Sequence, residues 1–99
     1  MARSITPNRS VKGRVTQTLK IKSKAKVNLE DTFVNFTWKI GGQEYTRRVP
    51  AMDGMATDEF VIKDLNMAEY HGKSLGCYPS NSVGGYNFTR FDISVERFP

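Results

Sequence analysis

The segments FVIKDL at residues 60–65 and FDISV at residues 91–95 place large apolar side chains at alternate positions. Because successive side chains of a strand point to opposite faces, this alternation predicts two half-buried strands. Between them lie Gly72, Asn81 and Gly84, residue types that tolerate the backbone conformations of tight turns. The second half of the chain is therefore predicted to consist of short strands joined by turns.

The first half shows the same period of two. Over residues 15–27, threonine or lysine occupies the even positions, and the odd positions are apolar or small apart from Gln17. This pattern predicts one half-buried strand or two strand segments in series. The next strand is expected over residues 33–40, and Gly41-Gly42-Gln43 has the composition of a hairpin turn before a strand over residues 44–49.

The same signals assign the remaining segments. Turns or corners are expected over residues 50–57, 66–72 and 81–85, and strands over residues 59–65, 73–79 and 86–95. We find no internal repeat and no amphipathic helix of ordinary length, so the pattern predicts an all-β sandwich or barrel. Residues 1–10 are polar and predict a flexible arm or edge strand, followed by one domain over residues 11–99.

The 99 residues suit one domain, and no apolar run is long enough for a membrane-spanning helix or a signal peptide. We therefore expect a soluble intracellular protein or a domain of a longer chain, without membrane insertion by this segment. The net charge of +5 is uneven: residues 1–50 hold eleven Lys or Arg against three acids, and residues 51–99 hold four against seven. Such asymmetry indicates either a polyanion partner or two halves that neutralise each other.

Three sets of residues together resemble the intermediate set of immunoglobulin domains. They are Trp38 followed by Lys-Ile-Gly-Gly, the pattern Phe60-x-Ile62-x-x-Leu65, and Cys77 followed by Asn81 and Gly84. Cys77 follows Trp38 by 39 residues, a span that suits strands C to F of such a domain. The resemblance implies an all-β, two-sheet antiparallel sandwich of 7 to 9 strands in which Trp38 and Cys77 meet in the core.

The chain departs from that family at three points. Ser23 and Ala25 stand where its first cysteine is expected, Leu75 replaces the tyrosine before the second cysteine, and Glu69 with Gly72 only approximates its Asp-x-Gly corner. The chain holds one cysteine and so no intrachain disulfide, a loss of about 2–4 kcal/mol that core packing must replace. The predicted core comprises Trp38, Cys77, Leu75, Ile21, Phe60, Ile62, Leu65 and Ile93, together with Leu19, Val34, Phe36, Phe91 and Val95.

A lysine strip formed by Lys20, Lys22, Lys24 and Lys26 is the most conspicuous candidate surface. On a strand these side chains project at intervals of about 6.6–6.8 Å and could follow a sulfated glycosaminoglycan such as heparan sulfate or an acidic filament. Alternatively, a paired strand presenting Glu59, with Asp58 and Asp64 nearby, neutralises the strip. No aromatic residue interleaves with the lysines to stack bases, which argues against nucleic acid.

A second candidate surface is a protein interface made by Tyr86, Phe88 and Arg90, whose parity is opposite to that of the apolar positions 91, 93 and 95. Aromatic and arginine side chains are favoured at interfaces. A bulge at Gly84-Gly85 would instead reverse the alternation and turn the patch inward.

Three glycosylation sequons begin at Asn8, Asn35 and Asn87. About one is expected by chance, so the excess favours secretion, although coincidence in a threonine-rich chain explains it as well. By strand parity Asn35 is expected to face solvent.

No catalytic, metal-binding or cofactor-binding residue is predicted. Cys77 is expected to be buried and inert, and Cys77 with His71 falls short of the about four ligands of a structural zinc site. We therefore expect a non-catalytic domain of a larger cell-surface receptor or adhesion protein that contacts another protein or acts as a spacer. The alternatives are an intracellular muscle or cytoskeletal domain and a viral or phage decoration domain.

Overall fold

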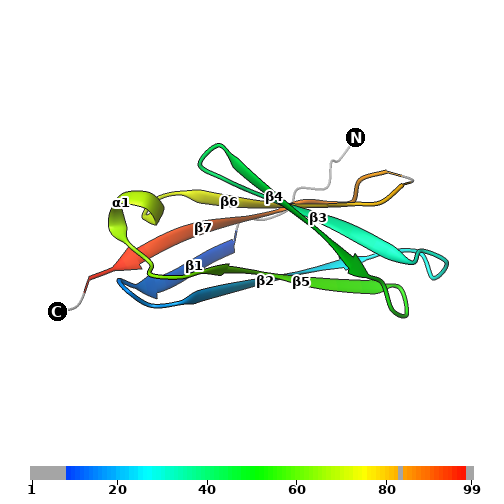
Figure 1. Ribbon diagram of the computed structural model, residues 1–99, viewed down its shortest axis with the longest axis horizontal. Helices are drawn as coiled ribbons and strands as arrows, with labels where there is room; N and C mark the ends of the chain where they lie inside the picture. The colour runs from blue at the N-terminus through cyan, green and yellow to red at the C-terminus, as the bar shows by residue number, and fades with distance from the viewer. Residues whose placement is uncertain (1–8, 83, 98–99) are drawn as a thin grey trace, which may run out of the picture.

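The computed structural model describes residues 9–82 and 84–97, which form seven strands and one short helix (Figure 1). The elements are β1 (Arg9–Arg14), β2 (Leu19–Lys26), β3 (Phe33–Ile40), β4 (Gln43–Pro50), β5 (Met55–Ile62), α1 (Met67–Tyr70), β6 (Ser74–Ser80) and β7 (Thr89–Glu96). A five-stranded sheet of order β1-β7-β6-β3-β4 faces a two-stranded sheet of β2 and β5. The predicted all-β sandwich is therefore confirmed.

Neighbouring strands are antiparallel in both sheets except at one edge, where β1 runs parallel to β7. The first residues of β1, Arg9 and Ser10, belong to the segment predicted as an arm or edge strand. The predicted arm over residues 1–8 lies outside the described residues.

The core lies between the two sheets and is centred on Trp38. This residue of β3 is the cross-strand partner of Cys77 on β6, and its ring stacks on those of Phe60 at 5.3 Å and Phe91 at 6.3 Å. Of the predicted core residues, the structure buries all but Phe60, which is partly exposed and packs against the others.

The alternation of β2 appears as predicted. Leu19, Ile21, Ser23 and Ala25 are buried, whereas the lysine side chains between them are exposed. The strand begins at Leu19 and not at Val15, because residues 15–18 turn the chain from one sheet to the other. Thr16 has a positive φ of 70°, and its N–H donates to the Leu65 carbonyl.

Other boundaries were also predicted wrongly, among them the end of the strand predicted over residues 59–65, which ends at Ile62. The turn predicted over residues 50–57 is only a two-residue hairpin turn, since Asp53 and Gly54 both have positive φ and Met55 already belongs to β5. The corner over residues 66–72 contains α1, whose N-cap Asn66 accepts a hydrogen bond from the N–H of Glu69. The last strand begins at Thr89, three residues later than predicted.

The β4–β5 hairpin joins the two sheets directly. Its strands diverge from the turn at residues 53–54, β4 crossing over to the five-stranded sheet while β5 pairs with β2 (Figure 1). Within the described part of the chain, β4 bonds along one side to β3 and β5 along one side to β2. Each therefore leaves its other edge without a neighbouring strand.

Candidate functional site

The buried centre joins the two sheets through polar side chains. Trp38 Nε1 donates to Asp58 Oδ2 at 2.8 Å, and Arg47 Nε lies 3.6 Å from Asp58 Oδ1. Asp58 is only 5% exposed. A buried carboxylate is tolerated where it accepts hydrogen bonds or faces a cation, and these two partners satisfy Asp58.

Sequence reasoning placed Asp58 beside the lysine strip, which is wrong. The carboxylate points between the sheets because Asp58 has the same parity as Phe60 and Ile62 on β5. That parity could have revealed its inward position, but an acidic residue is seldom assigned to a core. The role of Asp58 in the core is to accept the hydrogen bond of Trp38, because a buried indole N–H needs an acceptor.

Ser23 stands where the bridge-forming cysteine of the resembled family is expected. It is buried, lies opposite Asp58 on the neighbouring strand, and its hydroxyl is near enough to the Cys77 thiol to influence its pKa. Burial raises the pKa of the Cys77 thiol to about 11, although the Ser23 hydroxyl acts to lower it. At neutral pH the thiol is therefore protonated and a poor nucleophile.

The lysine strip projects from the outer face of the two-stranded sheet. Across the ladder, Lys22 lies opposite Glu59, and the other three lysines lie opposite Val61, Thr57 and Met55. In residues 9–82 and 84–97, no carboxylate lies within 4 Å of any of the four amino groups. Since Asp58 is buried, Glu59 is the one acid directly across from the strip, and the strip keeps most of its positive charge.

The outer face of the five-stranded sheet carries an aromatic cluster formed by Tyr78 and Phe88. Their rings stack at 5.3 Å with 19° between the planes, and Lys39 Nζ lies 4.9 Å from the centre of the Tyr78 ring. The Tyr78 ring lies over Gly76, where a Cβ atom would come within 2.6 Å of a ring carbon. Glycine at this position therefore lets the ring lie flat on the sheet.

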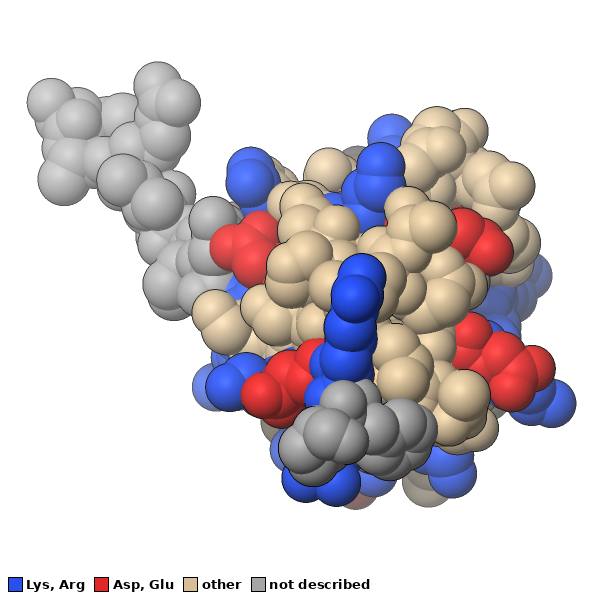
Figure 2. Space-filling model, turned by 90° about the vertical axis from the view of Figure 1, so that its left-hand side faces the viewer, with Lys and Arg blue, Asp and Glu red and all other residues tan. Residues whose placement is uncertain are grey.

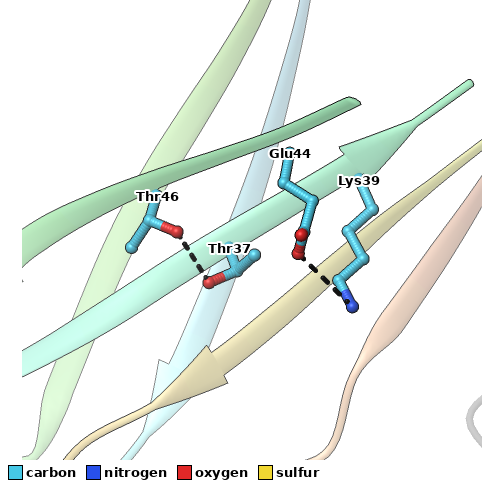
Figure 3. A network of polar contacts seen from close by, with 4 residues as sticks. All are labelled: Thr37, Lys39, Glu44 and Thr46. Atoms are coloured by element: carbon cyan, nitrogen blue, oxygen red, sulfur yellow. Dashed lines mark hydrogen bonds and ion pairs between the residues drawn. The ribbon is translucent and has the colours of Figure 1, made fainter. Parts of the chain in front are cut away.

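Polar pairs hold the side chains around the aromatic cluster. Thr37 and Thr46 share a hydrogen bond of 3.0 Å, and Lys39 Nζ lies 3.5 Å from a Glu44 carboxylate oxygen (Figure 3). Nearby, Arg90 Nε lies 3.5 Å from Asp92 Oδ1. Each exposed pair adds little stability, but together they limit the conformations that the face presents.

Of the predicted interface, Phe88 and Arg90 are exposed, but Tyr86 is not part of that surface. The Tyr86 hydroxyl donates to Asp31 Oδ2 at 2.8 Å and accepts from Asn81 Nδ2 at 2.6 Å, so it ties the β6–β7 connection to the β2–β3 connection. Strand parity failed here because residues 86–88 precede the strand. Tyr78 could have been identified from strand parity on β6, because its side chain points to the opposite face from that of its buried neighbour Cys77.

The three sequons fall in different settings. Asn35 is half-buried on the outer face of β3, flanked across the ladders by Arg48 and Ser80. Asn87 is exposed in the β6–β7 connection. The sequon at Asn8 begins outside the described residues.

A groove of about 590 Å³ opens where β4 and β5 diverge, with α1 contributing to its wall. Its aromatic lining consists of Trp38, Tyr45, Phe60 and Tyr70, with the Tyr45 and Phe60 rings 5.7 Å apart. Its charged lining consists of Arg47, Lys63, Lys73 and Glu69. The groove is amphipathic, with three cations against one anion.

Unlike the lysine strip, the end of the sandwich that carries α1 shows no surface of a single charge sign. There, acidic and basic side chains are interspersed among uncharged ones (Figure 2). His71 follows α1, and its Nδ1 accepts the N–H of Val95 at 3.0 Å, a bond that anchors this end to β7. His71 thus has a structural partner.

The described residues contain no group of three or more His, Cys, Asp or Glu side chains placed to hold a metal ion. Among these residues, no helix has the length and apolar character needed to cross a membrane. Comparison with known family models and with curated protein sequences finds no match to this chain.

Proposed function

We propose that this chain is a non-catalytic immunoglobulin-like recognition domain that binds another protein through the outer face of its five-stranded sheet. The stacked pair of Tyr78 and Phe88 carries the proposal. Aromatic side chains are enriched among the residues that dominate binding energy at interfaces. Rings already held by stacking and by Lys39 lose less conformational freedom on binding than mobile side chains do.

The cations beside the rings favour a partner that carries acidic groups. Arg90 and Lys39 are both about half exposed, and each has an acidic neighbour at 3.5 Å. A partner that offers carboxylates could exchange with these neighbours, whereas apolar partner groups would cover the rings. The expected interface therefore has an aromatic centre and a charged rim, the usual anatomy of protein contacts.

We place this domain in the extracellular part of a larger modular receptor or adhesion protein, as an intermediate-set member. The exposed sequon at Asn87 supports this setting. Asn35 lies on the proposed binding face itself, so a glycan there would cover the face that is meant to bind. Asn87, which is exposed in the β6–β7 connection, is therefore the sequon that we expect to carry a glycan.

A second candidate function is binding of a sulfated polysaccharide such as heparan sulfate by the lysine strip. It is favoured by the single acid opposite the four lysines and by the absence of ion pairs to them in the described chain. Regularly spaced cations along a strand match the repeating negative charge of such polymers.

The protein-binding proposal can be tested by presenting tetramers of the domain to cells that express a library of receptor ectodomains. We expect at least one binder, whose affinity falls at least tenfold in Phe88→Ala and Arg90→Ala. The matched control is Leu29→Ala, a change at an 81% exposed apolar residue elsewhere on the surface. The absence of any binder, or a binder equally sensitive to all three changes, would contradict the proposal.

A further inference from the structure

The two edges of the small sheet differ in how they are guarded against pairing with another strand. β2 carries a lysine at every second position from Lys20 to Lys26. β5, with the sequence MATDEFVI, carries no Lys, Arg or Pro. Lysine and proline on edge strands prevent unwanted pairing in natural sheets. The edge at β2 is therefore protected by four lysines, whereas the charges of β5 are Glu59 and the inward Asp58, which is already bonded to Trp38.

The backbone of β5 has the capacity to pair. Within the described residues, the backbone groups of Ala56 through Ile62 bond to β2 and to no other strand. In an antiparallel ladder only alternate residues face a given neighbour, so the remaining N–H and C=O groups point toward the free edge. Two strands are also the fewest that can form a sheet, and a third strand would stabilise it.

The groove beside this edge can take the side chains of an added strand. It lies between β5 and β4, and its volume of about 590 Å³ falls within the range of ligand-binding pockets, roughly 300–1,000 Å³. Tyr45 and Phe60 contact each other in its lining, and Phe60 continues into the core through Trp38. Apolar side chains entering the groove would therefore extend an existing aromatic stack.

The charged residues that line the groove indicate which class of partner it would bind. Lys63, Lys73 and Arg47 line the groove against a single acid, Glu69. Arg47 is 67% exposed although it lies near Asp58, so it remains accessible. A strand that carries carboxylates at either end of its apolar run would meet these cations, whereas a basic strand would be repelled.

We infer that the free edge of β5 and the adjoining groove form a strand-addition site for an extended acidic peptide segment of a partner protein. The segment pairs its backbone with β5 as a third strand of the small sheet. Its alternate apolar side chains enter the groove against Tyr45 and Phe60, and carboxylates at the two ends of the apolar run contact Lys63 and Lys73. Backbone pairing supplies affinity and the groove supplies selectivity, as in other cases of strand addition.

The test uses a displayed library of ten-residue peptides with Val, Ile, Leu or Phe at alternate central positions, Ser or Thr between them and Asp or Glu at both ends, and the best binder is then synthesised. We expect amide hydrogen exchange at residues 56–62 to slow at least tenfold on binding. A peptide of the same composition in scrambled order, without the alternation, should bind at least tenfold more weakly.

Two variants examine the edge itself. Thr57→Glu with Val61→Glu places two carboxylates at exposed positions of β5, opposite Lys24 and Lys20. These charges are compatible with the pairing to β2 but repel an acidic segment, so we expect them to weaken peptide binding at least tenfold. Lys24→Gln on the guarded strand is the matched control and should leave binding unchanged. Phe88→Ala should also leave binding unchanged, which separates this site from the aromatic face.

The inference is overturned if no library member binds, if protection appears in β2 or around Tyr78 and not in β5, or if the two new glutamates leave affinity intact. Slower exchange confined to residues 56–62 and abolished by those glutamates would support it.

Discussion

The indole N–H of Trp38 on β3 donates a 2.8 Å hydrogen bond to the carboxylate of Asp58 on β5, so the two sheets share a buried polar bond as well as apolar contacts. The same carboxylate lies 3.6 Å from Arg47 on β4. Three strands thus converge on one side chain in a sandwich that has no disulfide to hold its sheets together.

Replacing this carboxylate should destabilise the fold. Asp58→Ala leaves the buried Trp38 N–H without its acceptor, and we expect the free energy of unfolding to fall by about 1–3 kcal/mol. Asp58→Asn keeps an oxygen acceptor and should lose less. Urea unfolding followed by Trp38 fluorescence measures both, with Glu59→Gln as a control on the same strand. Equal stability of Asp58→Ala and the original chain would refute the assigned role.

Ser23→Cys should form a disulfide with Cys77. Ser23 stands where the resembled family has its first cysteine, and its side chain lies near Cys77 across the core, so little backbone movement is needed. We expect oxidation to remove both free thiols and to stabilise the domain by about 2–4 kcal/mol. Ala25→Cys is the control, because Ala25 pairs with Ala56 and carries no such contact with Cys77. Two titratable thiols in oxidised Ser23→Cys protein would show that the pair is wrongly placed.

Stability should decline in alkaline solution through Cys77. Its pKa is raised by burial from 9.0 to about 11, so the unfolded chain loses the thiol proton at lower pH than the folded chain does. The stabilising contribution is complete below pH 9 and disappears as the pH rises to about 11, a loss of about 2–3 kcal/mol. Urea midpoints measured from pH 8 to 11 test this.

Tyrosines and lysines also titrate in that range, so the Cys77→Ala variant serves as the reference for the alkaline series. Its midpoints should decline less steeply than those of the original chain. Parallel curves for the two proteins would show that the thiol does not cause the loss.

Neutralising the lysine strip should reduce retention on immobilised heparin. The triple variant Lys20→Gln, Lys22→Gln, Lys24→Gln removes three cations from one face, and we expect it to elute at a clearly lower salt concentration. The control removes the same charge from dispersed positions, through Lys12→Gln, Lys39→Gln and Lys73→Gln. If both triple variants elute together, the strip acts only through net charge.

Expression through a mammalian secretory route should add an endoglycosidase-sensitive glycan at Asn87. This residue is exposed, whereas Asn35 lies half-buried between two neighbouring strands. Asn87→Gln should therefore remove the added mass, and Asn35→Gln should not. A secreted protein without any added mass would favour the intracellular alternative.

The alternation of apolar and polar residues predicted most of the strands, because each sheet buries one face and exposes the other. The lysines of β2 and the apolar positions of β7 alternate without interruption, and Trp38 and Cys77 meet as the resemblance implied. Parity also placed Arg90 on the surface. It could not place Tyr86, because residues outside a strand have no fixed alternation and the tyrosine follows its hydrogen bonds to Asp31 and Asn81.

The groove between β4 and β5 was not predictable from the sequence. It depends on how far two strands of one hairpin diverge after a two-residue turn, and nothing in the composition of residues 50–57 encodes that distance. Asp58 was missed for a different reason: its inward parity was visible, but its charge argued against burial until Trp38 and Arg47 were seen around it.

The parallel pairing of β1 with β7, from Arg9 opposite Phe91 to Arg14 opposite Glu96, bears on how the domain would carry mechanical load. A pull on Arg9 and Glu96 in opposite directions acts along both strands, so their backbone bonds resist in shear and must fail together. An antiparallel pair pulled from one end would instead unzip bond by bond. Such a terminal clamp suits a domain under tension, and it achieves this without a covalent crosslink.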